Sequence, residues 1–156
     1  MRLSELFREV EFDGSIKNDA DINLVTDDSR LVRPGSLFVC IRHRSFDGHT
    51  AALDALASGA AAVVTQDRLG LENELRVADS RSAYARLCAA LCNHPERRLR
   101  MIGVTGTNGK TTVTTLIRNI LSDSGAKTLL TGTVCNRLGD ENLPSGLTTP
   151  KPPELY

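Results

Sequence analysis

The sequence contains no tryptophan, and aromatic residues make up only 4% of its 156 residues. Proteins that bind single-stranded nucleic acid stack its bases on aromatic side chains, so this class of ligand is not expected. Positive and negative charges balance at 19 each, which gives no overall attraction to nucleic acid or to an anionic membrane surface. Glu5 and Glu9 interrupt the apolar positions of the first ten residues, so these are not expected to act as a signal peptide, and no apolar stretch is long enough to cross a bilayer. We therefore expect a cytoplasmic protein without a nucleic-acid or membrane partner.

The chain has only four cysteines, Cys40, Cys88, Cys92 and Cys135. Cys88 and Cys92 lie four residues apart on a predicted helix, but no further cysteine or histidine follows at the spacing of a metal site. Small buried thiols in a reducing cytoplasm are the simpler interpretation.

The first part of the sequence predicts alternating strands and helices. An apolar run over residues 36–41 follows a Pro-Gly turn and predicts a strand, and the Ala/Leu-rich residues 51–58 predict a helix that ends at Gly59. Residues 61–65 predict a second buried strand. Strand, helix and strand within about 30 residues are typical of a βαβ unit, which has parallel strands.

A second helix is predicted over residues 80–92, where apolar side chains recur at helical spacing and Ser80 is a plausible N-cap. It must end before Pro95, because proline disfavours helical backbone in the residue before it. The polar residues 96–100 resemble a linker, so we place a domain junction near residue 98.

Beyond the junction, residues 101–105 predict a strand, residues 111–122 an amphipathic helix ended by Gly125, and residues 127–131 another strand. These elements predict a second βαβ unit, and the tail over residues 138–156 shows no periodicity.

The predicted fold class is therefore α/β, with a small N-terminal domain over residues 1–98 and the first βαβ unit of a P-loop ATPase domain over residues 99–156. The second part is too short to cover both faces of a parallel sheet. We expect it to be the incomplete start of a larger domain.

The most informative stretch lies between the strand over residues 101–105 and the helix that follows it. It reads Gly106-Thr107-Asn108-Gly109-Lys110-Thr111-Thr112. Backbone N–H groups of such a loop, together with the helix N-terminus, bind phosphate oxygens. Lys110 can reach the β and γ phosphates of ATP, and the Thr111 hydroxyl can ligate Mg²⁺.

Two details depart from the generic phosphate-binding loop. The generic pattern places glycine at the position of Val104, and no acidic residue after residue 98 ends an apolar strand to hold the metal ion. A glycine-rich turn that carries a surface lysine is the alternative interpretation.

The loop over residues 106–112 resembles that of the Mur ligase family, the ATP-dependent amide ligases of cell-wall precursor synthesis. Three further segments strengthen the resemblance: residues 28–39, which resemble the family's "DSR…V.PG.LFV" segment; residues 46–49 with 57–64, which resemble "DGH…A…GA.AVV"; and residues 132–133 with 147–150, which resemble "GT…TTP". Their order and spacing favour the type of Mur ligase that adds a third amino acid, meso-diaminopimelate or L-lysine, to UDP-N-acetylmuramoyl-L-alanyl-D-glutamate.

The resemblance implies a UDP-substrate-binding first domain and an ATP-binding second one. The residues that match the family's substrate contacts are Ser29, Arg44, Ser45 and Phe46 for the UDP end, and Thr148 and Thr149 for the muramoyl-peptide end. The residues that match its ATP loop are Gly106, Thr107, Asn108, Gly109, Lys110, Thr111 and Thr112, of which Lys110 is the implied catalytic residue and Thr111 the implied metal ligand. The implied chemistry transfers the γ-phosphoryl group of ATP to the D-glutamyl carboxylate. The incoming amine then attacks the acyl phosphate and releases phosphate.

Basic residues in the loops of the first domain form a plausible cluster facing the diphosphate. They are Arg30, Arg33, Arg42, His43, Arg44 and His49. Solvent-exposed arginines are the alternative for each of them. The family often has glycine at the position of His43, so the loop that closes over the uracil can differ in shape here.

Three other interpretations stay open from the sequence. They are another Mur-like ligase, including one that extends folate with glutamate; a module that binds a UDP-sugar or ATP without catalysis; and a generic P-loop NTPase, against which the segments at 28–39 and 147–150 argue. We expect this polypeptide by itself to be inactive as a ligase.

Overall fold

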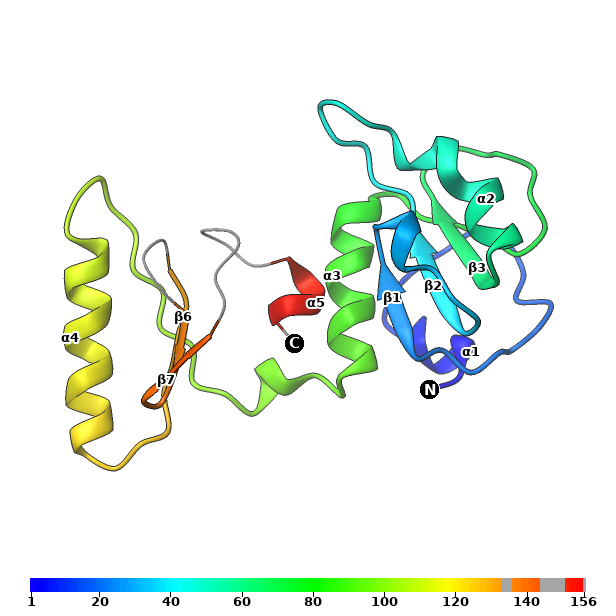
Figure 1. Cartoon of the computed structure of the whole chain (residues 1–156). Coiled ribbons are helices and arrows are strands. Elements are labelled where there is room, and N and C mark those ends of the chain that lie inside the picture. The colour runs from blue at the N-terminus through cyan, green and yellow to red at the C-terminus, as the bar shows by residue number, and fades with distance from the viewer. Residues whose placement is uncertain (133–135, 144–150, 156) are drawn as a thin grey trace. The chain divides into compact units, whose positions relative to one another are not determined.

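The computed structural model describes residues 1–132, 136–143 and 151–155 (Figure 1). It contains two compact units, Met1–Arg98 and Leu99–Leu155. The first unit holds a parallel sheet with helices on both of its faces, which confirms the predicted α/β fold class.

The sheet of the first unit has four parallel strands in the order β1-β2-β3-β4. Their bounds are Leu24–Thr26 for β1, Ser36–Val39 for β2, Ala60–Thr65 for β3 and Glu74–Arg76 for β4. All four residues of β2 are buried, as expected for a central strand of a parallel sheet. The predicted βαβ unit is confirmed, because β2 and β3 pair in parallel and a helix connects them.

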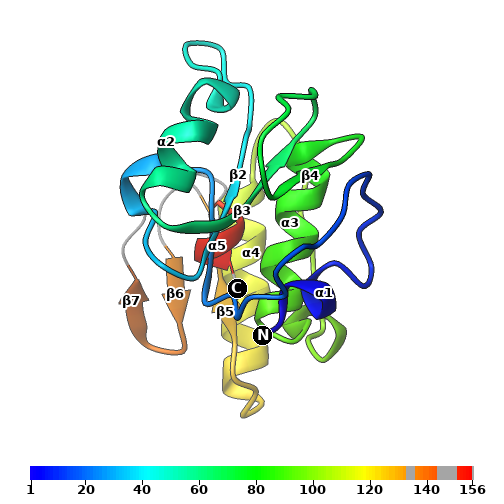
Figure 2. The same ribbon diagram turned by 90° about the vertical axis from the view of Figure 1, so that its right-hand side faces the viewer.

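The sheet has helices on both of its faces (Figure 2). Alternating side chains of β2 divide the core into two layers. Leu37 and Val39 pack on one face with the helices α1 (Leu3–Leu6) and α3 (Ser80–Leu91). Phe38 packs on the opposite face with α2 (Ala52–Ala57). Because successive side chains of a strand point to opposite faces, one short apolar run contributes to both layers.

Three short 3-10 helices connect the elements of this unit. They are η1 (Ser29–Leu31), η2 (Gly48–Ala51) and η3 (Pro95–Arg97). Gly48 has to be glycine, because a Cβ there would lie 2.8 Å from the backbone nitrogen of Ile41. The start of η2 thus lies directly against the chain that leaves β2.

Helix α3 begins as predicted, but its N-cap is Asp79 and not Ser80. The Asp79 carboxylate accepts hydrogen bonds from the backbone N–H groups of Arg81 and Ser82. The Ser80 hydroxyl is fully buried and instead donates to the side-chain oxygen of Gln66 at 2.9 Å. The carboxylate of Asp79 already satisfies the unpaired N–H groups of the first helical turn. The Ser80 side chain is therefore not needed as a cap and can take part in the packing of the core.

The cysteines agree only partly with the prediction. Cys40 and Cys88 are buried, and burial raises the pKa of each thiol to about 12. Cys92 is exposed, so the expectation of a buried thiol was wrong there. Cys135 lies outside the described residues.

In the second unit, the predicted amphipathic helix is confirmed as α4 (Lys110–Asp123). Gly125 follows its end with φ +86°, a left-handed conformation that lets the last turn close. The short strands β5 (Leu129–Leu130), β6 (Asn136–Leu138) and β7 (Glu141–Leu143) form an antiparallel sheet, and α5 covers Pro152–Leu155.

The predicted second βαβ unit was wrong. Residues 101–105 form no strand, and Met101 and Ile102 are 70% and 59% exposed. The strand β5 pairs antiparallel with β6 instead. A parallel strand is stable only beside neighbours that satisfy its N–H and C=O groups, and the described residues of this unit supply no parallel partner for 101–105.

The hairpin of β6 and β7 was missed, although the sequence contained a signal for it. Gly139 and Asp140 form the two-residue turn, and Gly139 has φ +55°. Such Gly-Asp pairs between strands are typical of tight hairpins. Arg118 of α4, the buried residue of that helix, donates to the Gly139 carbonyl and pairs with the Asp140 carboxylate.

The N-cap of α3 can be tested by substitution. Asp79→Ala should lower the free energy of unfolding by about 1 kcal/mol, because two backbone N–H groups lose their acceptor. Urea denaturation followed by circular dichroism measures this. Ser82→Ala is the matched control in the same helical turn and should be neutral or slightly stabilising; equal losses for both variants would contradict the cap assignment.

Candidate functional site

The candidate site of the first unit lies where strands β1, β2 and β3 end. Because the three strands are parallel, the connections that follow them, residues 27–31, 40–47 and 66–69, leave the same edge of the sheet. In open α/β sheets this edge is where ligands bind. The predicted UDP contacts Ser29, Arg44, Ser45 and Phe46 all lie on the first two of these connections.

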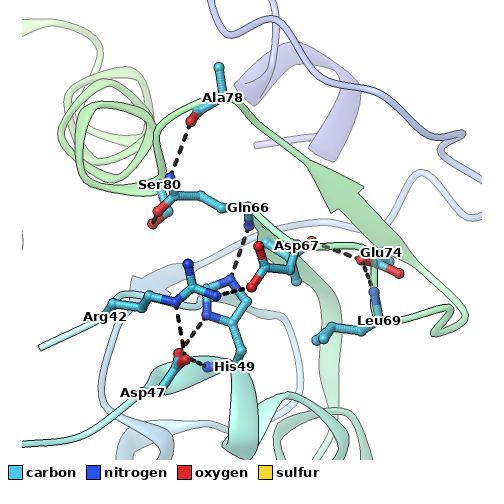
Figure 3. Close-up of polar contacts among 10 residues, drawn as sticks. Arg42, Asp47, His49, Gln66, Asp67, Leu69, Glu74, Ala78 and Ser80 are labelled. Atoms are coloured by element: carbon cyan, nitrogen blue, oxygen red, sulfur yellow. Dashed lines mark hydrogen bonds and ion pairs between the residues drawn. The ribbon is translucent and has the colours of Figure 1, made fainter.

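Polar contacts hold the three connections together. His43 of the second connection lies with its Nε2 3.4 Å from Oδ2 of Asp27 in the first. Arg42 pairs with Asp67 of the third connection, and its Nε donates to Oδ2 of Asp47 at 3.1 Å (Figure 3). The second connection is thus held from both sides.

His49 is a buried structural residue and not a ligand of the diphosphate. Its Nδ1 lies 2.6 Å from Oδ1 of Asp47, and the backbone N–H of Gln66 donates to its Nε2 at 3.1 Å (Figure 3). Since Nε2 accepts a hydrogen bond, Nδ1 is the ring nitrogen that donates to Asp47. Hydrogen bonds donated by the backbone and side chain of His49, and then by Arg42, lower the pKa of Asp47 to about 2.

Residues 43–46 form a tight turn that presents the predicted uracil loop. The His43 N–H donates to the Phe46 carbonyl at 2.8 Å, and Arg42 and Asp47 form a bridge at its base. Arg44 and Ser45 are exposed at the tip, and Phe46 is 49% exposed. A half-exposed aromatic ring beside an exposed arginine suits a flat base joined to phosphate.

Ser29 begins η1, whose N-cap is Asp28. The Asp28 carboxylate accepts from the Arg30 backbone N–H at 3.0 Å and from the Arg30 guanidinium at 2.6 Å. Arg30, like Arg42, is therefore committed to a carboxylate of its own unit. Arg30, Arg42 and His49 thus have partners within their own unit, and we remove them from the cluster of basic residues predicted to face a diphosphate.

In the second unit, the loop over residues 106–112 leads into the N-terminus of α4. Gly109 is the N-cap with φ +77°, and its carbonyl accepts from the N–H of Val113 at 2.9 Å. The Lys110 ammonium folds back over the loop and donates to the carbonyls of Gly106 at 2.6 Å and Thr107 at 3.2 Å. A cation, a helix N-terminus and exposed backbone thus face one small region, which is the arrangement that binds phosphate.

The loop also fits a magnesium ion that arrives with a nucleotide. Thr111 stands exposed in the first turn of α4, where its hydroxyl is one hard oxygen ligand. Among the described residues, no three histidine, cysteine, aspartate or glutamate side chains gather into a metal site. The remaining ligands would be phosphate oxygens and water, as is usual for Mg²⁺.

The predicted site residues also include two threonines near the end of the sequence. Thr148 and Thr149 lie outside the described residues. Asp27 and Asp67 were missed, although each follows the end of a parallel strand, and residues in those positions meet at one edge of the sheet.

In the part of the chain that the structure describes, no helix has the length and apolar character needed to cross a membrane.

A parallel α/β unit followed by a glycine-rich loop at a helix N-terminus is typical of nucleotide-binding proteins. Two family models match this chain, the Mur ligase family catalytic domain over residues 21–96 and the Mur ligase middle domain over residues 104–156. The chain belongs to the Mur ligase family.

Curated relatives of the chain are UDP-N-acetylmuramoyl-L-alanyl-D-glutamate–2,6-diaminopimelate ligases. That of Geobacillus kaustophilus is 46% identical over 132 residues, which are 84% of this chain and 27% of the relative. That of Listeria monocytogenes is 37% identical over 96% of this chain and 31% of the relative. The chain therefore spans about a third or less of the length of these relatives.

Solved structures of Mur ligases are also similar to this chain. A ligase of the same name matches with a TM-score of 0.76 and 29% identity over 99% of this chain and 32% of its own. MurF from Acinetobacter baumannii matches with a TM-score of 0.61 and 27% identity over 84% of this chain and 29% of its own.

The contacts of Asp47 with His49 and Arg42 should make the stability of the first unit depend on pH. Because the folded-state pKa of Asp47 is lowered, its contribution to stability is complete above the unfolded-state pKa, near 4, and is lost as the pH falls toward 2. Asp47→Asn keeps the oxygen that caps η2 but loses the charge that the His49 side chain and Arg42 contact, so it should lower the free energy of unfolding by about 1 kcal/mol at pH 7 and by much less near pH 2.

Urea denaturation at pH 7, 4 and 2.5 measures this difference. Asp54→Asn, a substitution of an exposed aspartate in α2, is the matched control and should show no such trend. A loss that is the same at all three pH values would contradict the account.

Proposed function

We propose that this chain comprises the UDP-substrate-binding domain (residues 1–98) and the beginning of the ATP-binding domain (residues 99–156) of a cytoplasmic ligase of peptidoglycan precursor synthesis. The ligase would join 2,6-diaminopimelate to UDP-N-acetylmuramoyl-L-alanyl-D-glutamate. The observation that carries the proposal is the identity of up to 46% to ligases named for this reaction, along 84% of the chain.

In the first unit, the turn over residues 43–46 would bind the UDP end of the substrate. The Phe46 ring would cover the uracil, and the Arg44 guanidinium would pair with the diphosphate. The hydroxyls of Ser29 and Ser45 would donate to the ligand from the two neighbouring connections. This assignment is supported by their common position at the edge of the sheet and by the exposure of the turn.

In the second unit, residues 106–112 would bind the phosphates of ATP. The Lys110 ammonium, which now donates to two loop carbonyls, would exchange these partners for phosphate oxygens and offset their charge. Thr111 would hold Mg²⁺, which neutralises phosphate charge when it is bound. Thr148 and Thr149 would hold the muramoyl-peptide end, a role that rests on the family resemblance alone.

In the whole reaction, the γ-phosphoryl group passes to the D-glutamyl carboxylate. The amine of the incoming amino acid then attacks this acyl phosphate, forms the amide and releases phosphate. The contribution of this chain would be to bind and orient the two nucleotides.

Binding of UDP to this chain tests the first half of the proposal. Isothermal titration calorimetry should show saturable binding, and Arg44→Ala should weaken it about tenfold, the loss expected for one charge-assisted contact. Arg33→Ala is the matched control, because Arg33 is equally exposed but precedes β2 at the opposite edge of the sheet. Absence of UDP binding, or equal weakening by both substitutions, would overturn this assignment.

Binding of Mg²⁺–ATP tests the second half. Lys110→Ala should weaken ATP binding at least tenfold and leave UDP binding unchanged, since the two loops belong to different units. Lys127→Ala, which removes a lysine beyond the end of α4, should change neither affinity. If ATP binds equally well to the Lys110→Ala protein, the loop is not the phosphate site. Fluorescence of a labelled ATP analogue provides the measurement.

A further inference from the structure

A buried carboxylate lies beside the proposed UDP site. Asp27 follows the end of β1, and its side chain is only 7% exposed. The hydroxyl of Tyr84, from α3, donates to its Oδ1 at 3.2 Å. Its Oδ2 faces Nε2 of His43 at 3.4 Å. Since both the strand and the helix belong to the core, Asp27 is a fixed point of the first unit.

His43 connects that fixed point to the exposed turn. Its backbone N–H closes the turn through the Phe46 carbonyl, whereas its imidazole contacts Asp27. One residue therefore belongs both to the turn that presents Arg44 and to a contact with the core. Any displacement of the turn has to break or stretch the contact between His43 and Asp27.

The other anchor of the turn acts only at its base. Arg42 is held by the carboxylates of Asp47 and Asp67, and its carbonyl accepts from Arg81. These contacts fix where the turn leaves the sheet but leave its tilt relative to β1 unspecified. The contact between His43 and Asp27 is the second point of attachment, and two points define an orientation.

We propose that Asp27 is a positioning residue that acts through His43, and that the pair orients the turn over residues 43–46 for binding a uridine nucleotide. The proposal rests on the proposed function, which assigns UDP to this turn. Asp27 does not touch the ligand; it stabilises the binding orientation before the ligand arrives. A loop that is ordered in advance loses less conformational freedom on binding, so affinity rises without a new contact.

The experiment is a double-mutant cycle on the complete chain, with Asp27→Asn, His43→Ala and the double variant. Two properties are measured: the Kd for UDP by calorimetry, and the hydrogen-exchange rate of the residue-43 amide without ligand by NMR. Each single substitution should weaken UDP binding roughly fivefold and accelerate exchange several-fold, the effect of one partly exposed polar contact. The double variant should be no worse than either single variant, because both remove the same contact.

Two further variants separate positioning from general loss of structure. His43→Gln retains a side-chain donor that can reach Asp27, so it should recover most of the affinity lost in His43→Ala. Tyr84→Phe removes one hydrogen bond to Asp27 but keeps the contact with His43, so the Kd for UDP should change less than twofold. A purely structural role for Asp27 predicts the opposite order for these two variants.

The two measurements distinguish this proposal from the proposed function. Additive effects of Asp27→Asn and His43→Ala on the exchange rate would overturn the contact as a positioning device. Coupled exchange rates with unchanged UDP affinity would overturn its role in binding. If the effects of the two substitutions on the exchange rate are coupled but the wild-type protein does not bind UDP, the contact between Asp27 and His43 is supported and the proposed function is overturned.

Discussion

The parallel pairing of β1, β2 and β3 is the constraint on which the first unit depends. Parallel pairing sends every connection that follows a strand to the same edge of the sheet, so residues far apart in sequence meet there. Asp27, Arg42 and Asp67 come from three different connections: Arg42 pairs with Asp67, and Asp27 contacts His43, the residue next to Arg42. The buried strands therefore create the candidate site, although they contribute none of its ligand contacts.

Charges at this edge serve two different purposes. Arg30 and Arg42 satisfy carboxylates of their own unit, and the buried His49 serves as a hydrogen-bonding link between Asp47 and Gln66. Arg44 projects from the exposed tip of a turn that the other charges hold in place. A basic side chain that pairs with a carboxylate of its own unit is less available to bind an anionic ligand. Which basic side chains have such a partner depends on the fold and cannot be inferred from the sequence alone.

In the second unit, helix α4 forms although the described residues contain no parallel sheet to cover its apolar side chains. Helix α4 forms, because its sequence has helical periodicity, a glycine N-cap and a glycine after its end. Its apolar side chains Val113, Leu116 and Ile120 are nevertheless exposed, and residues 101–105 make no strand. Local signals specify a helix, whereas a parallel strand requires partners from elsewhere in the chain.

The sequence by itself determined the elements whose signals are local. These are the strands around residues 36–41 and 61–65, the helix α3, the helices α2 and α4 that are each followed by a glycine, and the motifs that indicate the Mur ligase family. Long-range contacts were found only in the three-dimensional structure: Ser80 donates to Gln66 rather than capping α3, His49 is internal, and Asp27 contacts His43. Each of these depends on which side chains lie close together in space, and that proximity is fixed by strand pairing and packing rather than by spacing along the chain.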